Sequence, residues 1–159
     1  MGLEIERKYL VRHDLWHPAP GDGVPYRQGY LAFGAACVVR VRTMGDKAAL
    51  TIKGATKGIT RAEFEYPIPV ADAIELLDTM CGDATVEKRR YRVPFEGHVW
   101  EVDVFEGENA GLITAEVELP SADAEVIVPP WIDHEVTGDS RYANSALARR
   151  PFRSWTRHP

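Results

Sequence analysis

The stretch Leu3-Glu4-Ile5-Glu6-Arg7-Lys8-Tyr9-Leu10-Val11 decides the fold, because its side chains alternate in character with a period of two. In a strand, Glu4, Glu6 and Lys8 share one face, and the mostly apolar other face can pack on a core. Carboxylates about 6.5–7 Å apart disfavour each other's ionisation unless a cation lies beside them. An exposed strand with Glu–Lys pairs would explain this stretch in isolation. At least five later segments repeat the pattern, which calls for another explanation.

Composition fits one globular domain with a substantial core: 159 residues, 45% hydrophobic and 27% charged. The net charge of −5 argues against nucleic acid as a partner. The two cysteines, Cys37 and Cys81, match no metal-ligand or redox spacing. The sequence shows neither a signal peptide nor an apolar run long enough to span a bilayer. We therefore expect a cytoplasmic protein without a membrane partner.

Strand-like segments follow the first one at short intervals, separated by turns that contain glycine or proline. They are residues 26–33, 37–43, 48–53, 59–68, 85–95, 99–105 and 112–119. Eight strands in such close succession predict a mainly β fold, in which an antiparallel meander closes into a barrel with a few flanking helices. Closure removes the exposed edges that a sheet of this size would otherwise have.

Three helices are expected, at residues 70–80, at 121–128 and from about 141 to 149. The first carries an apolar stripe that could pack on the outer face of the strand at 59–68. Asp139 or Ser140 is the expected N-cap of the last helix. One barrel domain should span residues 1–150, and the tail from 151 to 159 is expected to fray.

The charged strand faces are too numerous for ordinary solvated surface. Residues that share such a face are Arg40 with Arg42, Lys53 with Thr51, Arg61 with Glu63 and Glu65, Lys88 with Arg90 and Arg92, Glu101 with Asp103, and Glu116 with Glu118. If the opposite, apolar faces are covered from outside, these charges must line the interior of the barrel. Buried charge is tolerated only when it is paired or ligating, so the interior should divide into two functional regions.

The chemistry of the two regions follows from their side chains. Clustered carboxylates without Cys or His suit hard cations such as Mg²⁺ or Mn²⁺. Arginines and lysines opposite them suit a polyanion. Metal, polyanion and many cations together are the inventory of phosphoryl transfer.

The motifs of the chain resemble those of the CYTH domain family, the triphosphate tunnel metalloenzymes. They begin with Glu4-Ile5-Glu6-Arg7-Lys8 and continue in order with Gln28-Gly29-Tyr30-Leu31, Val39-Arg40-Val41-Arg42, Leu50-Thr51-Ile52-Lys53-Gly54, Arg61-Ala62-Glu63-Phe64-Glu65, Lys88-Arg89-Arg90-Tyr91, Trp100-Glu101-Val102-Asp103, Ala115-Glu116-Val117-Glu118-Leu119 and Glu135-Val136-Thr137-Gly138-Asp139. The chain looks most like the short bacterial branch, whose members hydrolyse inorganic tripolyphosphate. The resemblance implies an eight-stranded antiparallel barrel around a closed tunnel, in agreement with the strand pattern.

The resemblance also implies roles for individual residues. The expected metal ligands are Glu4, Glu6, Glu116 and Glu118, with Asp103 near them. The expected triphosphate-binding residues are Lys8, Arg40, Arg42, Lys53, Arg61, Lys88 and Arg90. Glu63 and Glu65 should hold cations in place, with assistance to the second metal as an alternative role. Lys8 is expected to contact the substrate or the attacking water, and Tyr30 to hydrogen-bond Lys8 and temper its basicity. Lys8, Glu4, Glu118 and Tyr30 are accordingly the candidate catalytic residues.

The expected mechanism uses two metal ions, one on the phosphate chain and one on the water that attacks a terminal phosphorus. Alternatives within the family are hydrolysis of nucleoside or thiamine triphosphates and the cyclisation of ATP. An alternative of another class is a non-catalytic polyphosphate or nucleotide-binding module. Because we find no inward aromatic residue to stack a base, we expect tripolyphosphate to be preferred over ATP. A homodimer stays open.

Overall fold

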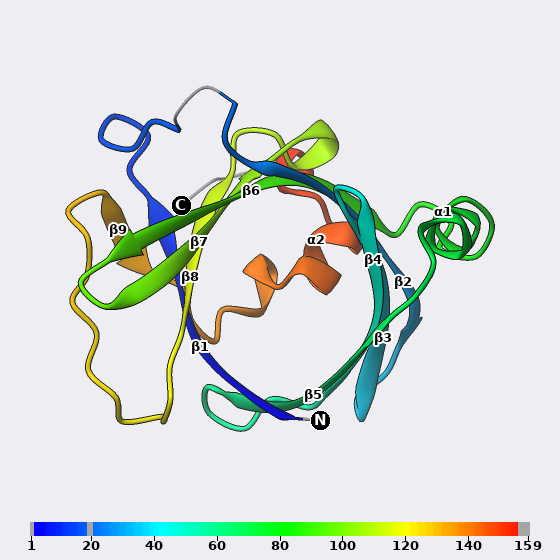
Figure 1. Ribbon diagram of the computed structural model, residues 1–159, viewed down its shortest axis with the longest axis horizontal. Coiled ribbons are helices and arrows are strands. Elements are labelled where there is room, and N and C mark those ends of the chain that lie inside the picture. The colour runs from blue at the N-terminus through cyan, green and yellow to red at the C-terminus, as the bar shows by residue number, and fades with distance from the viewer. Residues whose placement is uncertain (1, 19–20, 156–159) are drawn as a thin grey trace.

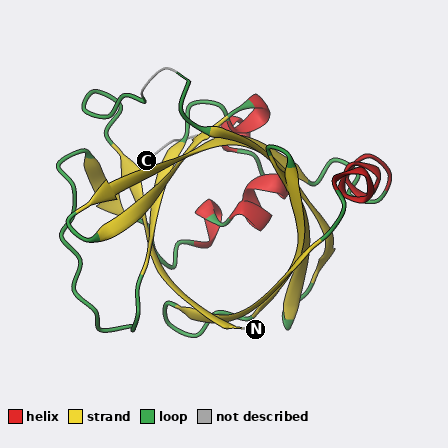
Figure 2. Ribbon diagram, viewed as in Figure 1, coloured by secondary structure: helices red, strands yellow, loops and turns green. Residues whose placement is uncertain are grey.

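The computed structural model, which describes residues 2–18 and 21–155, is an antiparallel barrel (Figures 1 and 2). Its strands are β1 (Gly2–Val11), β2 (Val24–Phe33), β3 (Cys37–Met44), β4 (Lys47–Gly54), β5 (Thr60–Pro67), β6 (Thr85–Phe95), β7 (His98–Phe105) and β8 (Ile113–Glu118). Around the ring the order is β5-β4-β3-β2-β6-β7-β8-β1, and β1 pairs with β5 to close it. The predicted closed barrel of eight antiparallel strands is confirmed.

The first strand has three partners, which is why its sequence is decisive. Its first residues pair with β5, its middle with β8, and its end with a ninth strand, β9 (Ile132–Glu135), which the sequence analysis missed. Glu6 lies opposite Glu118 in the β1–β8 register, and Glu4 lies opposite Arg61 in the β1–β5 register. Residues far apart in the sequence therefore meet on one wall of the barrel.

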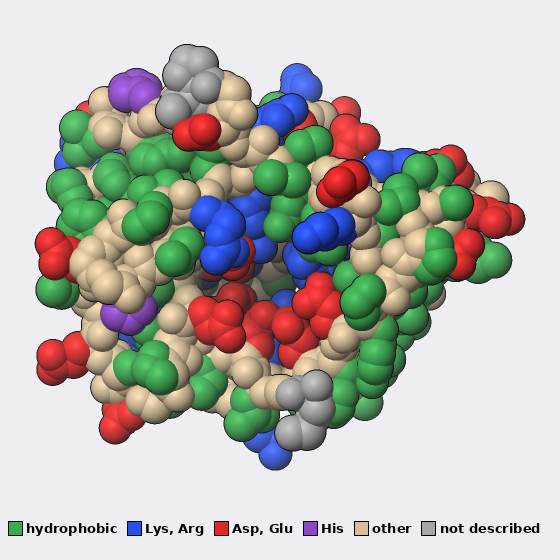
Figure 3. All heavy atoms as spheres, viewed as in Figure 1, with side chains coloured by type: hydrophobic (Ala, Val, Ile, Leu, Met, Phe, Trp, Pro, Cys, Tyr) green, Lys and Arg blue, Asp and Glu red, His purple; other side chains and the backbone are tan. Residues whose placement is uncertain are grey.

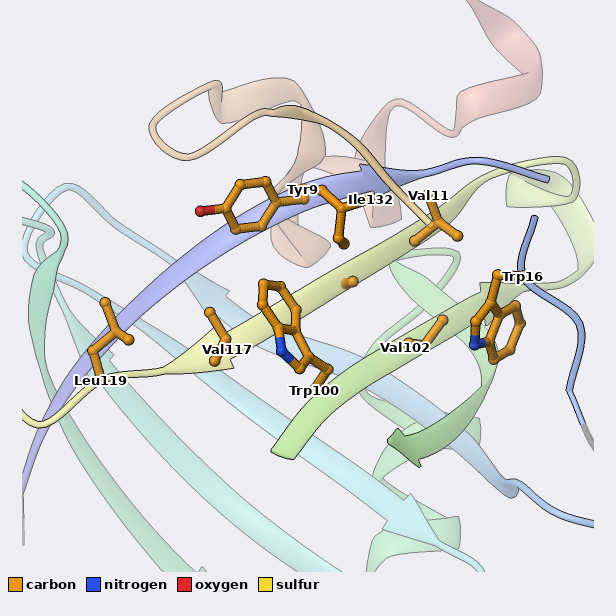
Figure 4. Packing of buried hydrophobic residues seen from close by; sticks show 9 residues of the cluster. Tyr9, Val11, Trp16, Trp100, Val102, Val117, Leu119 and Ile132 are labelled. Atoms are coloured by element: carbon orange, nitrogen blue, oxygen red, sulfur yellow. The ribbon is translucent and has the colours of Figure 1, made fainter. Parts of the chain in front are cut away.

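The apolar faces of β1, β7 and β8 point outward and carry the largest buried cluster (Figure 4). Trp100 is fully buried there, and its ring centroid lies 5.5 Å from that of Tyr9. The loop after β1 covers the cluster with Trp16, and β9 covers it with Ile132. Burial of such aromatic area stabilises the barrel from outside and leaves the inward faces to charged residues.

Helix α1 (Val70–Thr79) lies against the outer face of β3 and β4, beside the ring in Figure 1. It buries Ala73 and Leu77 against Val41 and Ala48. The helix was expected to pack on the outer face of the segment 59–68. Ile68, which follows β5, does pack against this cluster, but Tyr66 on the same face is 54% exposed, so the helix mainly covers β3 and β4 instead.

The last helix lies inside the ring of strands (Figures 1 and 2). The predicted helix at 141–149 is divided into a 3₁₀ turn, η2 (Ser140–Tyr142), and α2 (Asn144–Arg149). The division falls at Ala143, whose backbone is extended. Asp139 caps η2 by accepting a hydrogen bond from the backbone N–H of Arg141. Tyr142 and Leu147 pack with Tyr30 and Val86 in an apolar cluster, so the interior is apolar around this segment.

Two other expectations about the C-terminal third fail. Residues 121–128 form no helix, because the run of β-branched residues before Pro129 disfavours one. The described part of the tail does not fray: a 3₁₀ turn, η3 (Phe152–Ser154), follows α2, and the N–H of Phe152 donates to Asn109 Oδ1 at 2.8 Å. Asn109 belongs to η1 (Gly107–Asn109), and residues 156–159 lie outside the described part.

No helix in the described part is long and apolar enough to cross a bilayer.

Candidate functional site

The inward faces of the strands line a cavity of about 440 Å³ (Figure 3). On the face shown, acidic side chains gather on one side of the hollow and lysines and arginines on the other. The predicted residues that line the cavity are Glu4, Glu6, Lys8, Tyr30, Arg40, Arg42, Lys53, Arg61, Glu63, Glu65, Lys88, Arg90, Arg92, Glu101, Glu116 and Glu118. We call the carboxylates of β1 and β8 (Glu4, Glu6, Glu116 and Glu118) the acidic wall, and the cations of β3 and β6 (Arg40, Arg42, Lys88 and Arg90) the basic wall.

Glu6 and Glu118 face each other across β1 and β8. Neither carboxylate has an ion pair or hydrogen bond within the described residues. Burial, with repulsion from Glu116 and Glu4, raises the pKa of Glu6 to about 9. Burial, with repulsion from Glu4 and Glu101, also raises the pKa of Glu118. Lys8 and Lys53 attract these carboxylates only from a distance, so within the described residues neither has a cation in direct contact.

Lys53 lies between two other carboxylates near the acidic wall. Its Nζ is 3.0 Å from Glu4 Oε2 and 3.3 Å from Glu63 Oε2. The pKa of Glu4 is raised, chiefly by burial and against the pull of Lys53. Burial acts to raise the pKa of Glu63 too, but hydrogen bonding with Glu4 and the charge of Lys53 outweigh it, so that pKa is lowered. The two carboxyl groups thus share one ammonium and favour different protonation states.

Asp103 accepts hydrogen bonds from two cations of the basic wall, Lys88 and Arg90. Arg90 Nε and Nη2 donate to its two oxygens at 2.7 and 2.9 Å, and Lys88 Nζ donates at 2.7 Å. Asp103 is fully buried and does not line the cavity. Burial would raise its pKa, but Arg90 and Lys88 lower it, so Asp103 stays ionised. Burial lowers the pKa of Lys88 to about 7 despite this partner, and its ammonium also donates to Asn144 Oδ1 at 3.0 Å.

The other cations of the lining have weaker supports. Arg40 Nη2 donates to Thr51 Oγ1 at 3.2 Å, and Arg61 donates to the carbonyl of Gly54 at 2.8 and 3.0 Å. Arg42 has one ion pair within the described residues, at 3.5 Å from Glu65. Burial, with repulsion from Arg40 and Arg90, lowers the pKa of Arg42 to about 10.

Lys8 lies between the acidic wall and the C-terminal segment. Its Nζ is 3.4 Å from Glu116 Oε1 and donates to the carbonyl of Tyr142 at 3.1 Å. Burial acts to lower its pKa, but Glu116, Glu6 and Asp103 outweigh it, so the pKa is raised. The expected hydrogen bond from Tyr30 is absent from the described residues, because the Tyr30 hydroxyl accepts from Gln28 Nε2 at 3.0 Å instead.

Two aromatic side chains line the cavity, Tyr26 and Tyr30, so the expectation of no inward aromatic residue is wrong. The sequence could have predicted this orientation. Tyr26 and Tyr30 are separated by an even number of positions on one strand and therefore share a face, and Tyr30 was already expected to contact Lys8 in the interior. The ring of Tyr30 is stacked on that of Phe33, with centroids 5.4 Å apart. The ring of Tyr26 lies against cations of the basic wall.

The donor set of the acidic wall fits a hard divalent cation. It consists of carboxylate oxygens alone, and Glu6 and Glu118 carry repulsion that such a cation would relieve. No three such side chains are gathered tightly enough to ligate one ion within residues 2–18 and 21–155. Two of the four carboxylates contact ammonium groups instead of converging on one point. Lys53 binds Glu4, and Lys8 lies beside Glu116.

Comparison with known proteins finds the CYTH domain, which matches residues 2–146. An inorganic triphosphatase of Acetivibrio thermocellus is 49% identical over 98% of this chain and 99% of that protein. An inorganic triphosphatase of Nitrosomonas europaea is 40% identical over 91% of this chain and 96% of that protein.

Solved structures agree with this likeness. The crystal structure of an inorganic triphosphatase superposes with a TM-score of 0.67 at 38% identity, covering 93% of this chain and 95% of that one. A putative adenylate cyclase from Bacillus halodurans reaches a TM-score of 0.54 at 18% identity, covering 77% of this chain and 84% of that one. The second likeness concerns the fold alone.

Proposed function

The chain belongs to the CYTH domain family, and on this premise we propose that it hydrolyses inorganic tripolyphosphate to diphosphate and phosphate. The observation that carries the proposal is one cavity with an acidic wall facing a basic wall. A polyanion can lie on the basic wall while its other side faces carboxylates that call for metal. The two relatives named inorganic triphosphatase, at 49% and 40% identity, support the same substrate class.

The basic wall binds the phosphate chain in this proposal. Arg40, Arg42 and Arg90 present guanidinium groups that suit phosphate oxygens, with Lys53, Arg61 and Lys88 as further charges in reach of the cavity. Asp103 was expected near the metal, but its contacts favour another role, as the buried anchor that fixes Arg90 and Lys88. Preorganised cations of this kind stabilise the charge that develops on the leaving diphosphate.

The acidic wall would hold Mg²⁺ or Mn²⁺ through Glu4, Glu6, Glu116 and Glu118, and we propose two ions. When bound, such an ion supplies positive charge at the phosphate oxygens and lowers the pKa of a water. Glu63 and Glu65 hold Lys53 and Arg42 in place rather than face the phosphate chain themselves.

Lys8 acts as a hydrogen-bond donor, since its raised pKa keeps the ammonium protonated. In this role it orients a phosphate oxygen or the attacking water and does not accept the proton. Tyr30 lines the cavity next to the apolar cluster. From there its hydroxyl can contact the phosphate oxygen or the water that Lys8 orients. The cytoplasmic location, the absence of a nucleic-acid partner and the homodimer stay predictions of the sequence.

A substrate panel tests the proposal. Phosphate release is measured from tripolyphosphate, ATP, thiamine triphosphate and diphosphate with Mg²⁺ or Mn²⁺. We expect the highest kcat/KM for tripolyphosphate and little release from diphosphate, which is too short to span the cations and the metal. The base of ATP has no unengaged ring in the described lining, because Tyr30 stacks on Phe33 and Tyr26 contacts arginines. ATP cleaved as efficiently as tripolyphosphate, or a cyclic product, would overturn the substrate assignment. Tight binding without phosphate release would indicate a binding module instead.

A further inference from the structure

Tyr26 occupies a special place in the basic wall. It points inward from β2, the strand that separates β3, which carries Arg42, from β6, which carries Arg90. The Arg42 Cζ lies 4.9 Å from the ring centroid of Tyr26, and the Arg90 Cζ lies 5.0 Å from it. Lys88 Nζ is 5.9 Å away and sits opposite Tyr26 in the β2–β6 register. One ring therefore contacts cations from both neighbouring strands.

The two arginines depend on this ring to different degrees. Arg90 is fixed by two hydrogen bonds to the buried Asp103. Arg42 has only a 3.5 Å ion pair to Glu65, which is 38% exposed, and its buried Nε has no hydrogen-bond partner in the described structure. Arg40 and Arg90 both repel it. The electron-rich face of an aromatic ring attracts a guanidinium, which offsets part of this repulsion.

We propose that Tyr26 is a positioning residue for the polyanion site: its ring holds the Arg42 guanidinium at the cavity. This inference rests on the proposed function for its substrate, although the ring–arginine contact does not. The hydroxyl of Tyr26 makes no hydrogen bond within the described residues, so the ring face is the part that matters. Because the ring is engaged by arginines, it is not a platform for a nucleotide base.

Kinetics of Tyr26→Leu and Tyr26→Phe test the role of the ring. Losing a desolvated cation–π contact should raise KM for tripolyphosphate about 3- to 30-fold in Tyr26→Leu, with a much smaller change in kcat. Tyr26→Phe keeps the ring and should stay close to wild type. Tyr66→Leu, a tyrosine on the outer face of β5, is the matched control and should change neither constant. Should Tyr26→Leu fail to fold, Tyr26→Met takes its place as the variant without a ring.

A double-mutant cycle with Arg42→Gln separates positioning from packing. If the ring acts through Arg42, Tyr26→Leu should weaken binding much less in the Arg42→Gln background than in wild type. Equal effects in both backgrounds, an unchanged KM in Tyr26→Leu, or a Tyr26→Phe variant as impaired as Tyr26→Leu would each overturn the proposal.

A measurement without substrate keeps the two proposals distinguishable. The ring current of Tyr26 should shift the NMR signal of the Arg42 Nε–H, which is assigned by its loss in Arg42→Gln. That shift should disappear in Tyr26→Leu and persist in Tyr26→Phe. If it does so in a protein that fails to hydrolyse tripolyphosphate, the proposed function is wrong and the positioning of Arg42 stands. If the Arg42 Nε–H signal has the same chemical shift in wild type, Tyr26→Leu and Tyr26→Phe, the positioning role is wrong whatever the substrate.

Discussion

The acidic and basic walls of the cavity carry opposite charges and are supported in opposite ways. Behind the basic wall, Asp103 fixes Arg90 and Lys88 by hydrogen bonds of 2.7 to 2.9 Å, and the ring of Tyr26 lies against two guanidinium groups. In the acidic wall, Glu6 and Glu118 face each other without a partner in the described structure. Buried charge needs compensation, and the acidic wall is compensated only in part. Lys53 lies 3.0 Å from Glu4 and Lys8 lies 3.4 Å from Glu116, but Glu6 and Glu118 have no such contact in the described structure.

Charge alone therefore does not distinguish a wall that is fixed by internal partners from one that leaves carboxylates without them. In the described structure a buried carboxylate lies against two cations of the basic wall, whereas Glu6 and Glu118 of the acidic wall have no cation in direct contact. Under the proposed function, these two carboxylates are where a metal ion would bind. A variant that removes a support of the basic wall should therefore lower the stability of the fold, whereas a variant that removes a carboxylate from the acidic wall should lower activity.

The largest effect is expected from the support of the basic wall. Asp103→Asn leaves Arg90 and Lys88 buried without their carboxylate, which should lower the free energy of unfolding by about 3–5 kcal/mol. Asp78→Asn is the matched control, because its ion pair with Arg27 is equally short at 2.7 Å but exposed, and should cost at most about 1 kcal/mol. Urea unfolding of both variants measures this. Equal losses would mean that Asp103 is no buried anchor.

The next effect concerns the acidic wall and its metal. Glu118→Gln removes a carboxylate that has no ion pair or hydrogen bond within the described residues, so the fold should survive while triphosphatase activity falls about 100-fold or more. Chelation with excess EDTA should also abolish the activity of the wild type, and added Mg²⁺ or Mn²⁺ should restore that activity. Circular dichroism serves as the control for folding. Full turnover in EDTA would contradict the assignment of the acidic wall to metal.

Removing one cation from the basic wall should weaken substrate binding. A charge-assisted contact is worth about 1.5–3 kcal/mol, so Arg40→Ala should raise KM for tripolyphosphate about 10- to 150-fold. Arg92, which is 67% exposed in its side chain, provides the control, and Arg92→Ala should change KM far less. Arg40→Ala with unchanged KM and kcat would show that the basic wall does not bind the substrate.

The last effect concerns the metal-free protein, whose stability should depend on pH. Folding raises the pKa of Glu6 to about 9 from an ordinary value of 4.5, so its ionisation destabilises the fold progressively as pH rises between these values. Glu6→Gln removes that cost and should raise the Tm at pH 8 by about 2–4 °C for each kcal/mol regained. Near pH 4 the two proteins should unfold at similar temperatures. An equal difference at both pH values would exclude Glu6 ionisation as its cause.

Sequence reasoning found most of the cavity because inward or outward orientation is a local property. A strand places every second side chain on the same face, so Glu4, Glu6, Arg40, Lys53 and Glu116 could be assigned to the interior without knowing their neighbours. The same rule places Tyr26 there, because it shares a face of β2 with Tyr30. The closed barrel followed from the number of strands and their short connections.

The tertiary structure decided the depth and the partner of each side chain, because both depend on register between strands far apart in the sequence. Parity put Asp103 inside, but only the β6–β7 register places it beneath Arg90, away from the cavity. The helical pattern at 141–149 was visible, yet no local signal shows that α2 lies inside the ring, where Tyr142 accepts from Lys8. Alternation is fixed within a few residues, whereas compensation of a buried charge is settled only once the barrel closes.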